Sequence, residues 1–262
     1  MKMYPFIELF GLKISMNALG IVLWIATFLL VTYSLCKKNH QDFLKLFYQI
    51  PWWVLVCFIL WSYVGYALTN GVLIPASWSE FWTIFIPKNN NVHFVGLLLA
   101  AVICISVFFS SIKRVENKKI WADILFLGIS SACIVLGIFF VLWDTFIGKP
   151  TESFLWVQSL SQESNLTKFN GVYPVGLFLS FWALIVHFIF NSIRIFFKKN
   201  GCGLLGFIFL LIVLNVCFFF QAYPRYGVFP IGWGIIDIKQ YVSLFVMILI
   251  LCCYIKWGRN KF

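Results

Sequence analysis

The stretch Cys202–Ala222 reads CGLLGFIFLLIVLNVCFFFQA and contains no charged side chain. About 20 consecutive apolar residues are needed to cross the hydrocarbon core of a bilayer, and a core helix of a soluble protein needs fewer. Because lipid offers no partner to a bare backbone N–H or C=O, such a stretch must be helical. Stretches of this kind recur along the chain, and the sequence predicts about seven membrane spans, near residues 16–36, 51–70, 92–112, 121–143, 172–193, 202–222 and 238–255.

The composition agrees with an integral membrane protein. Of the 262 residues, 62% are hydrophobic and 11% are charged, against roughly 25% charged residues in an ordinary soluble domain. We find no internal repeat and no linker, so we expect a single all-α membrane domain over residues 1–262, a bundle of about seven helices.

The net charge of +11 could suggest a nucleic-acid partner, but the positions of the charges argue against one. Lysine and arginine cluster after the first, third, fifth and seventh spans, at Lys37, Lys38, Lys45, Lys113, Arg114, Lys118, Lys119, Arg194, Lys198, Lys199, Lys256, Arg259 and Lys261. The positive-inside rule then places the C-terminus in the cytoplasm and the N-terminus outside.

Two connections on the outer side have distinct compositions. Ser77 is a good N-cap residue, and the aromatic residues after it recur at helical spacing, which predicts a short helix lying at the interface near 77–86. The segment 144–171 is the most polar in the chain and predicts an outer polar arm.

Ionisable groups inside spans are the default functional candidates, because they are costly in lipid unless they are paired or face water. His93, beside a run of asparagines, is our candidate catalytic residue. We interpret Asp123 as a carboxylate in the first turn of its helix, favoured by the helix dipole. We expect His187 to make an interhelical contact or to lie near the inner interface.

Metal and cofactor motifs are absent from the sequence. There is no C-x-x-C, no His-x-x-x-His and no glycine-rich phosphate loop among the 262 residues. The eight cysteines are spread singly apart from Cys252–Cys253, and we expect them to be reduced thiols that pack as small hydrophobic groups. We therefore expect no metal and no cofactor.

Several short segments occur in the order of one known family. They are Val64–Leu68 followed by Asn70, Trp121–Leu125 (L-A-D-L-L in the family), Gly148–Thr151 (G-R-P-T), Tyr173–Phe178 (H-P-x-Q-L-Y-E), Cys202–Leu210 (G-G-L-F-G-L-F-L-L) and Ile238–Leu244 (M-G-Q-L-L-S-L). With these segments the chain resembles prolipoprotein diacylglyceryl transferase, a multi-pass enzyme of the bacterial inner membrane.

The resemblance implies transfer of a diacylglyceryl group from phosphatidylglycerol to the lipobox cysteine of a prolipoprotein. It implies a membrane phospholipid and a lipoprotein precursor as partners, with an inner-membrane location and no nucleic acid. Candidate positions for binding the lipid or the substrate are Tyr66, Asn70, Asp144, Tyr173, Arg225, Lys239 and Gln240.

The sequence departs from the family where its chemistry lies. The family motif H-G-G aligns with Val95–Leu97, two positions from His93, and the head-group signature G-R-x-G-N-F-x-N-G-E aligns with Leu136–Thr145. A further family arginine aligns with Val216. The alternative function is therefore an inactive family member that binds lipid or lipoprotein, or a subunit of a membrane complex. A transporter is a third class, which the lack of paired charges in the spans disfavours.

Overall fold

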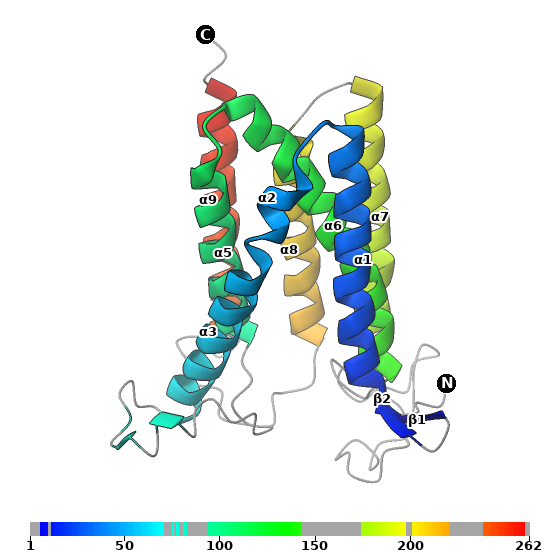
Figure 1. The fold of residues 1–262 in the computed structure, drawn as a ribbon, viewed down its shortest axis with the longest axis vertical. Coiled ribbons are helices and arrows are strands. Elements are labelled where there is room, and N and C mark those ends of the chain that lie inside the picture. Colours follow the sequence, from blue (N-terminus) through cyan, green and yellow to red (C-terminus); the bar gives the residue numbers. More distant parts are fainter. Residues whose placement is uncertain are drawn as a thin grey trace. The chain divides into compact units, whose positions relative to one another are not determined.

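The computed structural model describes residues 6–9, 12–70, 75, 77–78, 81–82, 94–142, 174–197, 201–220 and 238–259. Strands β1 (Phe6–Leu9) and β2 (Leu12–Ser15) form an antiparallel hairpin that leads directly into α1 (Met16–Lys38). The other described elements are helices, coloured along the chain in Figure 1: α2 (Phe43–Phe47), α3 (Ile50–Asn70), α5 (Phe94–Ser111), α6 (Val115–Leu142), α7 (Val175–Phe197), α8 (Cys202–Phe220) and α9 (Ile238–Arg259).

The seven long helices fall on the seven predicted apolar stretches, which confirms the helical fold. Four helical stretches of the described chain are long and apolar enough to cross a membrane: Leu19–Lys38, Phe43–Val64, Val115–Phe139 and Val175–Phe196. Three more helical stretches are apolar but shorter within the described residues, Leu99–Ser111, Cys202–Cys217 and Val242–Lys256.

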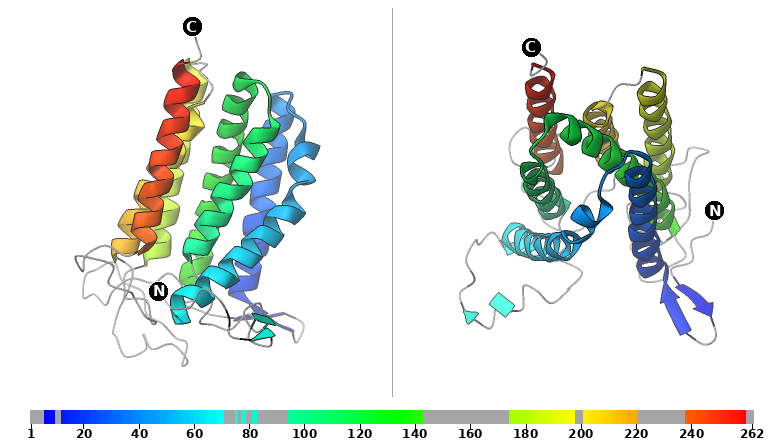
Figure 2. Two further views of the ribbon diagram at one scale, coloured as in Figure 1. Left: turned by 90° about the vertical axis from the view of Figure 1, so that its left-hand side faces the viewer. Right: turned by 45° about the horizontal axis from the view of Figure 1, so that its top comes forward.

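Two short elements were not predicted. The hairpin pairs Phe6 with Ser15 and Leu9 with Leu12, and it lies at the N-terminal end of α1 (Figure 2). Helix α2 begins after Asp42, whose Oδ1 accepts a hydrogen bond from the Leu44 N–H at 3.0 Å. Asp42 is thus an N-cap residue, a signal that the sequence carries.

The predicted outer elements are described only in part. Trp78, Phe81 and Trp82 are helical, and the Phe81 N–H donates to the Ser77 carbonyl at 3.0 Å. Both tryptophans are exposed, as an interfacial helix requires. The remainder of the predicted helix, residues 79–80 and 83–86, and the whole predicted arm, 144–171, lie outside the described residues.

The chain forms two compact units. Unit 1 contains residues 1–41, 119–223 and 250–262, and unit 2 contains residues 42–118 and 224–249.

Unit 1 is built around α6, in which every residue from Trp121 to Gly128 is buried. Phe126 packs edge-on against Phe190 of α7 and Phe207 of α8, with ring centroids 5.9 and 5.5 Å apart. Small residues allow helices to approach closely in a membrane, where apolar burial gives little driving force. Gly128 is one of these residues, because a Cβ atom there would lie 2.6 Å from the Thr32 hydroxyl of α1.

In unit 2, α3 and α5 pack against each other in antiparallel fashion. Trp53 of α3 contacts Phe108 of α5 edge-on, with ring centroids 6.0 Å apart. One turn further along each helix, the side chains of Cys57 and Cys104 are neighbours. This register aligns the start of α3 with the end of α5.

Candidate functional site: a polar clamp at the ends of four helices

Most of the residues that the sequence singled out lie outside the part of the chain that can be described. His93, Asp144, Tyr173 and Arg225 are outside the described residues. Tyr66 and Asn70 lie in the last turns of α3, and Lys239 and Gln240 lie in the first turn of α9, where only the backbone is described. Their roles therefore stay predictions.

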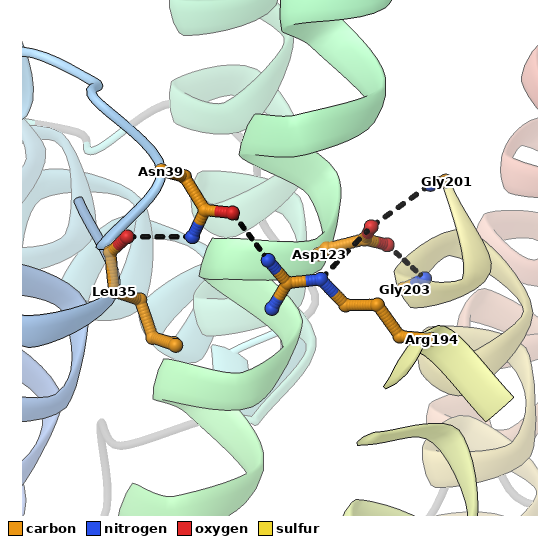
Figure 3. A network of polar contacts seen from close by, with 6 residues as sticks. All are labelled: Leu35, Asn39, Asp123, Arg194, Gly201 and Gly203. Carbon is orange, nitrogen blue, oxygen red and sulfur yellow. Dashed lines mark hydrogen bonds and ion pairs between the residues drawn. The ribbon is translucent and has the colours of Figure 1, made fainter. Parts of the chain in front are cut away.

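A charged cluster in unit 1 joins several helices, as Figure 3 shows. We call it the polar clamp, and it comprises Asn39, Asp123, Arg194, Gly201 and Gly203.

Asp123 is the centre of the polar clamp. The residue is 1% exposed, and its two carboxylate oxygens accept hydrogen bonds from the N–H groups of Gly201 at 2.9 Å and Gly203 at 2.6 Å. These N–H groups belong to the N-terminus of α8, where the backbone has no partner within the helix. Asp123 of α6 therefore caps a different helix, and its negative charge lies at the positive end of the α8 dipole.

The interpretation of Asp123 as a first-turn residue of its own helix is wrong. Helix α6 begins at Val115, so Asp123 lies in the third turn of α6. The dipole that favours the negative charge of Asp123 is that of α8. The first residues of α8 lie next to Asp123 in the fold but far from it in the sequence.

Arg194 extends the polar clamp to α1. Its Nε lies 3.8 Å from Asp123 Oδ2, and its Nη2 donates to Asn39 Oδ1 at 2.5 Å. Asn39 in turn donates to the Leu35 carbonyl at 2.6 Å, in the last turns of α1. Arg194 follows the predicted span 172–193 and lies in the last turn of α7, so this pair forms at the helix ends and the prediction that the spans hold no paired charges stays a prediction.

The backbone at Gly201 and Gly203 makes the polar clamp possible. Gly201 has φ +94°, a conformation that side chains other than glycine's adopt with strain. At Gly203 a Cβ atom would lie 2.5 Å from the Ala122 carbonyl oxygen and 2.7 Å from Asp123 Cα. The two glycines thus allow the start of α8 to lie directly against α6.

A second polar contact joins α6 and α7 further along the two helices. Ser130 Oγ lies 2.8 Å from His187 Nδ1, and Ser131 Oγ lies 3.4 Å from the same nitrogen. This contact confirms the interhelical prediction for His187. Ser130 is fully buried, so its hydroxyl has no path to a substrate.

The contacts of the polar clamp hold helices together and are not arranged for catalysis. Both carboxylate oxygens of Asp123 already accept backbone hydrogen bonds, which leaves it poorly suited to accept a proton from a substrate. The described residues contain no group of three or more His, Cys, Asp or Glu side chains that could hold a metal ion.

Sequence reasoning did not find the polar clamp. From the sequence, Arg194 is one of the charges that set the topology, and no pattern indicates a role for Asn39. The nearest signal is the segment Trp121–Leu125, since an aspartate between apolar residues of a span requires a partner.

No family model matches the chain, and no curated protein matches it either.

Proposed function

We propose that this chain is a multi-pass protein of the bacterial inner membrane, built on the scaffold of prolipoprotein diacylglyceryl transferase, and that it binds a membrane phospholipid without transferring its diacylglyceryl group. Two of the sequence segments that resemble the family support the proposed family scaffold. Trp121–Leu125 and Cys202–Leu210 are about 80 residues apart in the chain, yet they pack together through Gly203 and Asp123.

The proposal that the chain does not transfer the diacylglyceryl group rests on one observation, the packing around Gly137. The alignment places the arginine of the head-group signature at this residue. A Cβ atom added at Gly137 would collide with the Gly176 carbonyl oxygen and with Ser180 Oγ, both in α7. Because not even a methyl group fits there, this helix pair has no room for a bidentate arginine that could bind a phosphate.

The second aligned arginine position supports the same conclusion. Val216 of α8 is 51% exposed and apolar. A valine at this place suits contact with lipid chains and offers no charge to an anionic head group. Transfer also requires a general base and a group that stabilises the departing phosphate.

The proposed topology has the N-terminus outside and the C-terminus in the cytoplasm. In unit 1 the polar clamp brings together the C-terminal ends of α1 and α7 and the N-terminal ends of α6 and α8. Lys37 and Lys38 lie in the last turn of α1, at the same ends. Four helix ends and these basic residues therefore share one side of unit 1. This arrangement fits the positive-inside rule with that side in the cytoplasm.

The binding part of the proposal is tested by native mass spectrometry of the full chain, purified from a phosphatidylglycerol-containing membrane in mild detergent. We expect a mass adduct equal to one intact phospholipid, retained under activation that strips detergent. The matched control is a single-span membrane protein purified in parallel. If both proteins carry the same lipids in the same proportion, specific lipid binding is excluded. A co-purifying prolipoprotein or membrane protein in place of lipid would assign the chain to a protein complex.

A further inference from the structure

Two of the eight cysteines face each other across a helix pair. Cys57 of α3 and Cys104 of α5 are both free, and their side chains are neighbours across the helix pair. Trp53 and Phe108 pack together four residues away on each helix, which fixes the register of α3 against α5. The packed Trp53–Phe108 contact therefore places Cys57 and Cys104 at the same level of the two helices.

We propose that Cys57 and Cys104 form a redox-active pair, which a bilayer-soluble two-electron oxidant of the quinone class closes to a disulfide. Two S–H bonds break and one S–S bond forms between α3 and α5. The two electrons and two protons pass to the two carbonyl oxygens of the quinone, which leaves as the hydroquinone. A thiol reductant reverses the reaction by exchange.

The depth of the pair favours an oxidant from the lipid phase. Cys57 lies seven residues after the start of α3, and Cys104 lies seven residues before the end of α5. At 1.5 Å per residue the pair is about 10 Å from these helix ends. Aqueous reductants keep cytosolic thiols reduced, whereas this pair lies within the apolar part of α3 and α5, where a lipid-soluble oxidant is concentrated. Val54 and Phe58, beside Cys57 on α3, are exposed, so a quinone ring can approach through the lipid.

The other cysteines provide internal controls. Cys133 and Cys217 make no hydrogen bond to another thiol in the described part of the chain. Cys252 and Cys253 are exposed but adjacent on one helix, where successive side chains point about 100° apart.

The test uses the full chain in detergent micelles, incubated with a short-chain ubiquinone analogue. The protein is then denatured in an alkylating reagent, digested and analysed by mass spectrometry. We expect a linked pair of peptides containing Cys57 and Cys104 that lacks two hydrogen atoms, while Cys217 is alkylated as fully as before oxidation. Melting of the oxidised protein should shift upward, and dithiothreitol should reverse both effects.

Two variants make the result specific. Cys57→Ser should abolish the linked peptides and the melting shift, and it should leave Cys104 open to alkylation. Cys217→Ser should change neither result. Complete alkylation of Cys57 and Cys104 after quinone treatment would overturn the proposal. Closure by diamide but not by the quinone would also overturn it, because the pair would then lack its proposed oxidant.

Discussion

Removing the Asp123 carboxylate should destabilise the protein more than any change on the surface of α6. In Asp123→Ala the N–H groups of Gly201 and Gly203 lose their acceptors, and Arg194 loses its partner. Net contributions of hydrogen bonds to charged groups are about 1.5–3 kcal/mol each. Breaking a buried ion pair by removing one partner costs roughly 3–5 kcal/mol. Because these effects share one carboxylate, we expect a loss of about 3–5 kcal/mol in the free energy of unfolding.

The conservative variant Asp123→Asn separates the contribution of one hydrogen bond from that of the charge and the second hydrogen bond. The amide of Asp123→Asn keeps one oxygen acceptor, so it can hold one of the two α8 N–H groups. We expect it to lose about half as much, roughly 2 kcal/mol, because the charge and the second acceptor are gone.

The assay is equilibrium unfolding in mixed micelles of increasing SDS fraction, followed by circular dichroism at constant protein concentration. The matched control is Glu116→Ala, because Glu116 is an exposed carboxylate in the first turn of the same helix. Its effect should stay within about 0.5 kcal/mol. If Asp123→Ala is no more destabilising than Glu116→Ala, Asp123 does not cap α8 in the membrane.

Three further predictions concern the packing of unit 1. Gly137→Ala should lower the free energy of unfolding by about 1–3 kcal/mol, since its Cβ atom meets the α7 backbone; an unchanged unfolding midpoint would contradict the close contact. Phe126→Ala should cost about 3–5 kcal/mol, because the ring is 1% exposed between α7 and α8, and a loss below about 1 kcal/mol would contradict that burial. Ser130→Ala and His187→Phe should each cost about 1 kcal/mol, with a double-mutant cycle showing coupling; strict additivity would exclude their hydrogen bond.

The positions of the helices could be predicted because lipid imposes one rule on every span. An uninterrupted apolar stretch must be helical, so the ranges of α1, α3, α7 and α8 follow from the absence of charges. Helix ends are less certain, because helices continue past the apolar region into the head-group layer. Helix α6 shows this effect, since it includes the polar residues 116–119 before its apolar part.

The polar clamp could not be predicted for a different reason. The contacts of Asp123 and Arg194 within it join residues 71 to 155 positions apart (194 − 123 = 71 for the ion pair), and a single sequence gives no sign that Asn39, Asp123 and Arg194 meet. Asp123 was assigned to the dipole of its own helix because its real partner, the start of α8, is adjacent only in the fold. The contact of His187 was easier to predict, because a histidine inside an apolar span requires a polar neighbour.

The central claim is a diacylglyceryl transferase-like scaffold without transfer. Its most direct test is lipidation of a reporter prolipoprotein in a bacterium depleted of its own transferase and expressing this chain, followed by gel shift and mass. The account predicts an unmodified reporter, in cells where the full chain is shown to be folded in the membrane. A reporter carrying diacylglycerol on its lipobox cysteine would contradict it, and would make His93→Ala and Arg225→Ala the next variants to measure.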